Sequence, residues 1–259
     1  MKFNTTQIIA IASAIVLLLV LQFVVRSRPS AKANKAPIAA ANAAVNVDFA
    51  QILSATKAGL NAEDSEKIKT LEDELKTKTV ASDKIAVLKK LASRWNEQGK
   101  LVIGGQYSTD IATLNPTDSA WSMAGTTFML ALKEQDNENL RTFAAANART
   151  AFENALSLNP TSIGHKINLA LSFVESSDNP MKGIGMLTEL TKTNPNDPII
   201  FMTLGKLAMR TGQYDKAVGR FEKVLELDKT NAVAHCLIAD AYENLKQHDK
   251  AVPHIKFCK

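Results

Sequence analysis

Turn-forming residues recur along the C-terminal part of this chain at a nearly constant interval. The pairs Asn115-Pro116, Asn159-Pro160, Asn194-Pro195 and Asp228-Lys229 are separated by 44, 35 and 34 residues. A fixed interval of this length is typical of a repeat protein, in which one supersecondary unit stacks on the next. The composition favours helical units, because Ala, Leu, Lys and Glu are abundant and the 259 residues include only 11 Gly. The period therefore predicts an all-α stack of helical hairpins.

The clearest unit runs from Pro198 to Asn231. Bulky, small and aromatic residues fall there at fixed offsets, namely Phe201, Leu204, Gly205, Ala208, Gly212, Tyr214, Ala217, Phe221 and Val224. This pattern resembles the tetratricopeptide repeat. Asp197 suits the N-cap of the first helix and Pro198 its first turn, where a missing N–H costs no hydrogen bond. Gly205 and Ala217 are small enough to let the two helices cross closely.

The same pattern extends through residues 83–259 with decreasing clarity toward the N-terminus. The resemblance implies a right-handed α-solenoid, with repeats at 83–117, 118–161, 162–196, 197–230 and 231–259. Before it, apolar residues at helical spacing predict N-terminal helices in residues 48–82, the second opening at Asn61. The second of these repeats is about ten residues too long, which predicts lengthened helices or an enlarged turn around Gln135 to Asn139. The last repeat is expected to remain in its second helix as far as Lys259, without the polar helix that normally closes a solenoid.

An 18-residue apolar run, from Ile8 to Val25, precedes the repeats. A helix of this length just crosses the ~30 Å hydrocarbon core, so residues 1–28 are predicted to form one transmembrane anchor. A cleaved secretory signal is the alternative, because Ala31-Lys32-Ala33 has the form of a cleavage site. Residues 29–47 are rich in Ala, Asn and Pro and predict a flexible linker.

The net charge of +5 is located entirely at the N-terminus, since residues 1–35 contain five basic and no acidic residues. The remainder is formally neutral, so no nucleic-acid partner is expected. The basic residues after the apolar run would place the repeats in the cytoplasm by the positive-inside rule. Many bacterial proteins of similar plan instead hold their repeats outside. A single-pass location in a bacterial inner membrane is expected, with the side of the repeats left open.

The resemblance also implies where a partner would bind. In the family, the first helix of each hairpin lines a concave groove, and positions 2, 5, 9 and 12 point into it. These positions, with the adjacent Arg210, give the predicted groove residues Ser122, Thr126, Met129, Ile167, Leu171, Met202, Lys206, Met209, Arg210, Asp240 and Glu243. Met side chains repack around varied ligands, so the expected partner is another protein or a peptide segment. Alternatively, the Met and Ile side chains merely pack between neighbouring hairpins.

Three of the four His and both Cys fall in the last repeat. The candidate metal ligands are His235, Cys236, His254 and Cys258, because zinc accepts imidazole nitrogen and thiolate sulfur. Their spacing matches no familiar metal motif, and Cys258 falls where the family has a small buried residue. No bound metal or cofactor is therefore expected. A disulfide between the two Cys would require an oxidising compartment.

The chain contains no nucleotide-binding loop, nucleophile elbow or metalloprotease pattern, so no enzymatic activity is expected. The leading prediction is a membrane-tethered scaffold that binds a protein partner in its groove, in envelope assembly or quality control. One alternative is a metal-responsive or redox-responsive module built on the His and Cys cluster. Another is a homo-oligomer formed through the uncapped last repeat.

Overall fold

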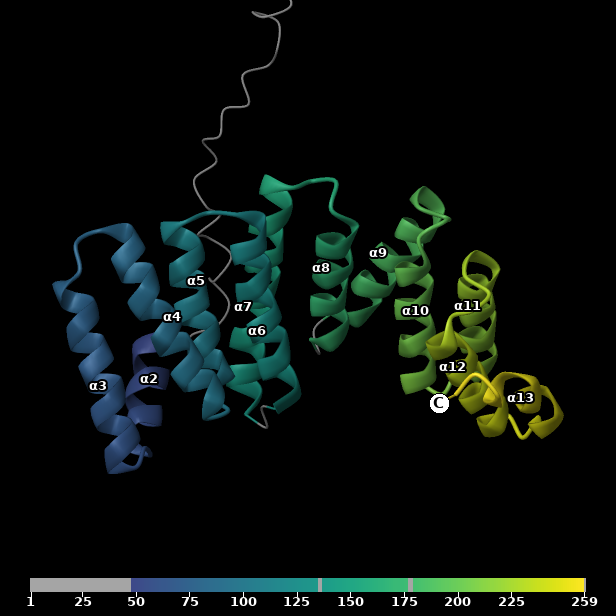
Figure 1. Ribbon diagram of the computed structural model, residues 1–259, viewed down its shortest axis with the longest axis horizontal. Helices are drawn as coiled ribbons and strands as arrows, with labels where there is room; N and C mark the ends of the chain where they lie inside the picture. Colours follow the sequence, from purple (N-terminus) through teal and green to yellow (C-terminus); the bar gives the residue numbers. More distant parts are fainter. Residues whose placement is uncertain (1–47, 135–136, 177–178, 259) are drawn as a thin grey trace, which may run out of the picture. The chain divides into compact units, whose positions relative to one another are not determined.

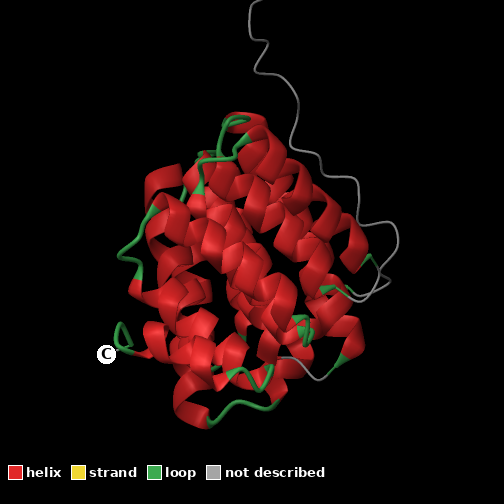
Figure 2. Ribbon diagram, turned by 90° about the vertical axis from the view of Figure 1, so that its right-hand side faces the viewer, coloured by secondary structure: helices red, strands yellow, loops and turns green. Residues whose placement is uncertain are grey.

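The computed structural model describes residues 48–134, 137–176 and 179–258, all of them within Ile38–Lys259, one of the two compact units into which the chain divides. These residues form helices and contain no strand (Figure 2). The helices are α2 (Phe49–Ala58), α3 (Ala62–Thr77), α4 (Ala81–Glu97), α5 (Leu101–Leu114), α6 (Asp118–Glu134), α7 (Glu138–Leu158), α8 (Ile163–Glu175), α9 (Pro180–Thr193), α10 (Pro198–Arg210), α11 (Tyr214–Leu227), α12 (Ala232–Asn244) and α13 (His248–Ile255).

The predicted anchor and linker, residues 1–28 and 29–47, lie outside the described residues. Within the described ranges, no helix combines the length and the apolar character needed to cross a membrane.

From α4 onward, each helix packs against the next one in the chain (Figure 1). The helices thus form successive hairpins, α4–α5, α6–α7, α8–α9, α10–α11 and α12–α13. α6 also contacts α8, so the first helices of these two hairpins lie next to each other. This arrangement is the one expected when each hairpin buries its apolar faces against its neighbours.

A glycine at the centre of the α10–α11 hairpin lets the two helices cross closely, as predicted. A Cβ added at Gly205 would lie 2.3 Å from Cε1 of Phe221, whose side chain is fully buried. The α6–α7 hairpin has the same arrangement, because a Cβ at Gly125 would lie 2.7 Å from Cε1 of Phe152. In both hairpins the ring of the second helix occupies the space where the glycine lacks a side chain.

Side-chain caps begin two of the helices where the sequence predicted them. The Oδ1 atom of Asn61 accepts a hydrogen bond from the N–H of Asp64 at 2.8 Å, and the Oδ1 atom of Asp197 accepts one from Ile199 at 2.9 Å. Pro198 follows Asp197 in the first turn. α4 begins at Ala81 after Val80, which makes no capping bond, so it starts slightly before the predicted Asp83. Asp83 then lies in the first turn, where a carboxylate favours the positive end of the helix.

The extra length of the second predicted repeat lies in its helices. α6 has 17 residues and α7 has 21, whereas α10 has 13 and α11 has 14. The prediction of lengthened helices is therefore confirmed.

Three of the hairpin turns close in the same way. In each turn one residue adopts a left-handed conformation, Gly99 at φ +68°, Gly212 at φ +70° and Lys246 at φ +60°. The next N–H then reaches back five residues, from Lys100 to the Trp95 carbonyl, from Gln213 to Ala208 and from Gln247 to Tyr242. This is the hydrogen-bond pattern of a Schellman motif, in which glycine is the usual left-handed residue. The last turn has lysine there instead.

Candidate protein-binding surface

The predicted groove residues of α6 and α8 divide into exposed and buried groups. Thr126 is exposed, and Ser122 and Met129 are half-buried. Ile167 is only 5% exposed and packs in an apolar cluster with side chains of α9 and α10. Leu171 is half-buried against the same cluster. Ile167 cannot touch a partner in this structure, because neighbouring helices cover it.

None of the groove residues of α10 is fully buried, in contrast to Ile167 of α8. Lys206 is exposed, while Met202 and Met209 are half-buried against the core that α10 shares with α11 and α12. Both nitrogens Nη1 and Nη2 of Arg210 bond the carboxylate of Glu175, the last residue of α8. Arg210 therefore links two first helices instead of offering a free charge to a partner.

The groove residues of α12 are both acidic and exposed. Glu243 pairs with His248 across the hairpin turn at 2.5 Å. Asp240 stands 34 residues after Lys206, at the same repeat position on the next first helix. Neither Lys206 nor Asp240 has a side-chain hydrogen bond or ion pair to another described residue. These two opposite charges remain available to a ligand.

Two aliphatic residues on the same helix faces were not predicted. Ile199 is 62% exposed and Val233 is 55% exposed, and they again lie 34 residues apart. Ile199 lies three residues before Met202 and seven before Lys206, so all three share one side of α10. The signal in the sequence was an aliphatic residue in the first turn of both helices. We call Ile199, Lys206, Val233 and Asp240 the α10–α12 face.

The last hairpin is closed by a disulfide between Cys236 of α12 and Cys258, whose Cα atoms lie 5.3 Å apart. α13 ends at Ile255, and residues 256–258 form a turn. The expectation of a helix continuing toward Lys259 is therefore wrong. Pro253 in the second turn of the helix lacks the N–H that would continue the hydrogen-bond ladder, and the chain turns back to reach Cys236.

Stacked and hydrogen-bonded rings lie beside the disulfide. The ring of Phe257 stacks on that of His235, with 3.8 Å between centroids and 7° between planes. The Nε2 atom of His235 lies 3.1 Å from the carbonyl oxygen of Lys229, which can only accept, so Nε2 donates. Its Nδ1 then accepts from Nδ1 of His254 at 2.8 Å. We call Cys236, Cys258, His235, His254 and Phe257 the clasp.

The clasp does not offer a metal site. Both sulfur atoms are bonded to each other, and the two Nδ1 atoms face each other. No group of three or more His, Cys, Asp or Glu side chains in the described part of the chain could hold a metal ion. With the disulfide closed, the four predicted ligands therefore do not form a metal site. Burial, together with the neighbouring His235, holds the pKa of His254 below its ordinary value.

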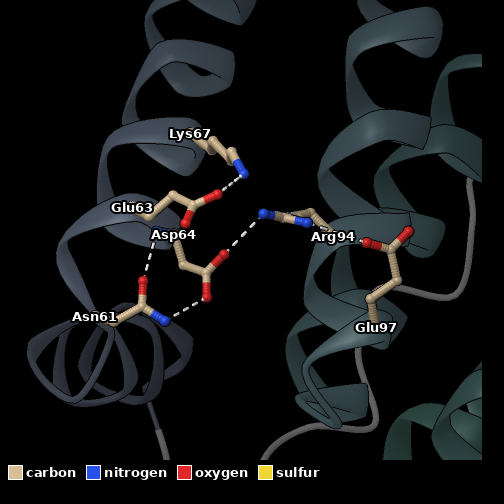
Figure 3. A network of polar contacts seen from close by, with 6 residues as sticks. All are labelled: Asn61, Glu63, Asp64, Lys67, Arg94 and Glu97. Atoms are coloured by element: carbon tan, nitrogen blue, oxygen red, sulfur yellow. Dashed lines mark hydrogen bonds and ion pairs between the residues drawn. The ribbon is translucent and has the colours of Figure 1, made fainter.

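A second surface feature, an open cleft of about 740 Å³ between α3 and α4, carries charges that are mostly paired. The Nη2 atom of Arg94 bonds Oδ1 of Asp64 at 2.8 Å, and Nη1 bonds Glu97 at 3.3 Å (Figure 3). Lys67 pairs with Glu63 on α3 (Figure 3). Of these ion pairs, Arg94–Asp64 joins the two helices and the other two lie within one helix, so the cleft is primarily a structural junction.

The comparisons with known proteins agree with the helical repeats. Residues 208–255 match the sequence profile of the tetratricopeptide repeat family. That segment begins near the end of α10 and ends with the last residue of α13, so it covers α11, α12 and α13. None of the curated proteins matches the chain.

Several solved structures are similar to part of the chain at low sequence identity. A crystal structure of the MamA protein is 18% identical, with a TM-score of 0.43, and the match covers 67% of this chain and 88% of that one. A second MamA structure is 18% identical, with a TM-score of 0.44, and covers 64% and 91%. YrrB, described as a tetratricopeptide repeat protein with an unusual peptide-binding site, is 19% identical, with a TM-score of 0.40, and covers 66% and 82%.

Proposed function

We propose that this chain is a membrane-tethered scaffold that binds another protein through the α10–α12 face, in envelope assembly or quality control. The observation that carries the proposal is the exposure of an aliphatic side chain and an unpaired charge at the same two repeat positions on successive first helices. Ile199 and Val233 supply apolar area, while Lys206 and Asp240 supply opposite charges. A polypeptide partner fits such a mixed row better than a small molecule does, because the contacts are spread along the surface.

The half-buried methionines add adaptability to this face. Met202 and Met209 pack partly against the core beneath them and partly face solvent. Their unbranched thioether side chains can shift to fit the partner. We expect specificity to depend on the two charges, since a mismatched partner would leave one of them unpaired.

The test is crosslinking of the intact chain in membranes followed by affinity capture. The variant carries Ile199→Glu and Lys206→Glu, which replace exposed side chains and leave the core unchanged. Met181→Glu is the matched control, because Met181 is 73% exposed but lies on the second helix α9. Selective loss of one or two captured proteins in the double variant alone, with unchanged helical circular dichroism, supports the proposal. Equal capture by both variants and by the original chain refutes it.

For the location, we propose a single-pass anchor at Ile8–Val25 that holds the repeats on the oxidising side of a bacterial inner membrane. The disulfide of the clasp supports this side, because such bonds persist in oxidising compartments and are rare in the cytosol. The side chosen is opposite to the one that the positive-inside rule alone favours. Protease added to cells with a permeabilised outer membrane should digest the repeats while a cytoplasmic marker survives. Survival of the repeats in that experiment would refute this orientation without bearing on the α10–α12 face.

A further inference from the structure

We propose that the Cys236–Cys258 disulfide is a thiol–disulfide exchange site that takes a reduced dithiol as its reactant, and that its opening releases α13 from α12. The bond joins α12 to a turn 22 residues further along the chain. It adds a covalent link, beyond the backbone itself, between α12 and the turn that follows α13. The partner that the chemistry requires is the dithiol of a thiol oxidoreductase.

The two sulfur atoms are not equally accessible. Cys258 is an exposed residue in the turn after α13, whereas Cys236 is half-buried in the first half of α12. An incoming thiolate therefore reaches the sulfur of Cys258 first.

The exchange proceeds in two balanced steps. A thiolate of the dithiol attacks Sγ of Cys258, forming a mixed disulfide, and the electron pair of the broken S–S bond leaves on Cys236 as a thiolate. In the mixed disulfide, the first sulfur of the dithiol is bonded to Sγ of Cys258. The second thiolate of the dithiol attacks that first sulfur and expels Cys258 as a thiolate. Two protons from solvent complete the two thiols. The protein disulfide is reduced, and the dithiol is oxidised to its own disulfide.

We expect opening of the bond to loosen α13, because beyond its packing on α12 this helix buries few side chains. This eight-residue helix buries only Ala251 and contains Pro253. Val252 and Ile255 are 64% and 48% exposed, whereas Val218 and Phe221, the residues 34 positions earlier on α11, are 7% and 0% exposed. Without the disulfide, the turn is held by the His235–His254 hydrogen bond and the Phe257 stack. Release of α13 would expose the face of α12 that it covers.

The first experiment measures hydrogen exchange by mass spectrometry on the intact chain in detergent, before and after dithiothreitol. We expect amides of α13 to exchange roughly tenfold faster or more after reduction, while those of α10 and α11 keep their rates. Maleimide labelling of two thiols confirms complete reduction. The double variant Cys236→Ser and Cys258→Ser should exchange like the reduced protein and not respond to dithiothreitol. Unchanged exchange in α13 after complete reduction would overturn the proposal.

The second experiment identifies the sulfur that is attacked. The oxidised protein is mixed with glutathione as a single thiol, quenched with acid within seconds and mapped by peptide mass. We expect the glutathione adduct predominantly on Cys258. An adduct equally distributed, or predominantly on Cys236, contradicts the proposed step. The proposal also fails if protein alkylated at the moment of lysis carries both cysteines as free thiols.

Discussion

Replacing Lys246 with glycine should stabilise the last hairpin. Lys246 occupies the left-handed position of the α12–α13 turn at φ +60°, where the α10–α11 turn has Gly212 at φ +70°. A residue with a Cβ pays about 1–2 kcal/mol in this conformation. Glycine avoids that cost but gives the unfolded chain more freedom, which offsets about 0.5–1 kcal/mol. The expected net gain for Lys246→Gly is therefore about 0.5–1 kcal/mol.

The local hydrogen bonds give no reason to expect a compensating loss. The N–H of Gln247 reaches the Tyr242 carbonyl at 2.9 Å, as Gln213 reaches Ala208 at 2.9 Å in the glycine-containing turn. The Lys246 side chain is exposed and makes no ion pair with a described residue. Nothing it contacts is lost on substitution.

The assay is hydrogen exchange of the α13 amides, which reports the free energy of opening this hairpin, with the thermal midpoint of the intact chain as a second readout. A gain of this size slows exchange about two- to fivefold and raises the midpoint by about 1–4 °C if unfolding is cooperative. Gly212→Lys should have the opposite effect on α11. Lys246→Ala is the decisive control, because it removes the long side chain and keeps the left-handed strain. If alanine stabilises as much as glycine does, backbone conformation is not the cause and the reasoning is wrong.

Three further predictions concern the core and the clasp. Gly205→Ala should lower stability by about 1–3 kcal/mol, because the new Cβ would lie 2.3 Å from Phe221; urea denaturation measures it, and a neutral result would mean that the ring relaxes freely. Cys258→Ser should lower the stability of the last hairpin by about 3 kcal/mol through loss of the ring closed across 22 residues, and dithiothreitol should then have no further effect on exchange. Because burial holds the pKa of His254 below 6.5, the folded clasp binds a proton less readily than the unfolded chain does. The stability that the clasp contributes should be complete above pH 6.5 and decline as the pH falls below 6.5. Hydrogen exchange of the α13 amides at two pH values would show this decline. An identical pH response in His254→Gln would refute the assignment to His254.

Features fixed by local chemistry could be predicted from the sequence. The caps at Asn61 and Asp197 depend on a side chain and an N–H two or three residues away, so a short stretch of sequence contains all that is needed. The close crossing at Gly205 follows from the repeat pattern, because the pattern has a small residue there between the two helices of one hairpin. Predicting these interactions does not require knowing how one hairpin is oriented on another.

Features that depend on neighbouring hairpins could not be predicted. Ile167 occupies a groove position on its own helix, yet α9 and α10 cover it, and a single sequence does not give the angle at which they pack. Arg210 looked like a free groove charge, but Glu175 of the preceding first helix binds it. The sequence did not decide whether Cys236 and Cys258 form a disulfide. The bond requires the chain to leave the helix after Ile255, and this also depends on how α13 packs on α12. Of the predicted groove charges, only Lys206 and Asp240 remained exposed and without a side-chain partner among the described residues.

The clasp and the weak last helix have a common physical explanation. One repeat earlier, Val224 is buried beneath α12, and the residue 34 positions later is Cys258. A buried aliphatic side chain stabilises a hairpin continuously, whereas a disulfide at that position does so only while it is oxidised. The same hairpin has lysine where Gly212 relieves strain, and it buries a single residue of its second helix. Each of these differences lowers the intrinsic stability of α13 and increases its dependence on the covalent bond. The last hairpin is therefore the part of the described chain whose structure should respond most strongly to the redox state around it.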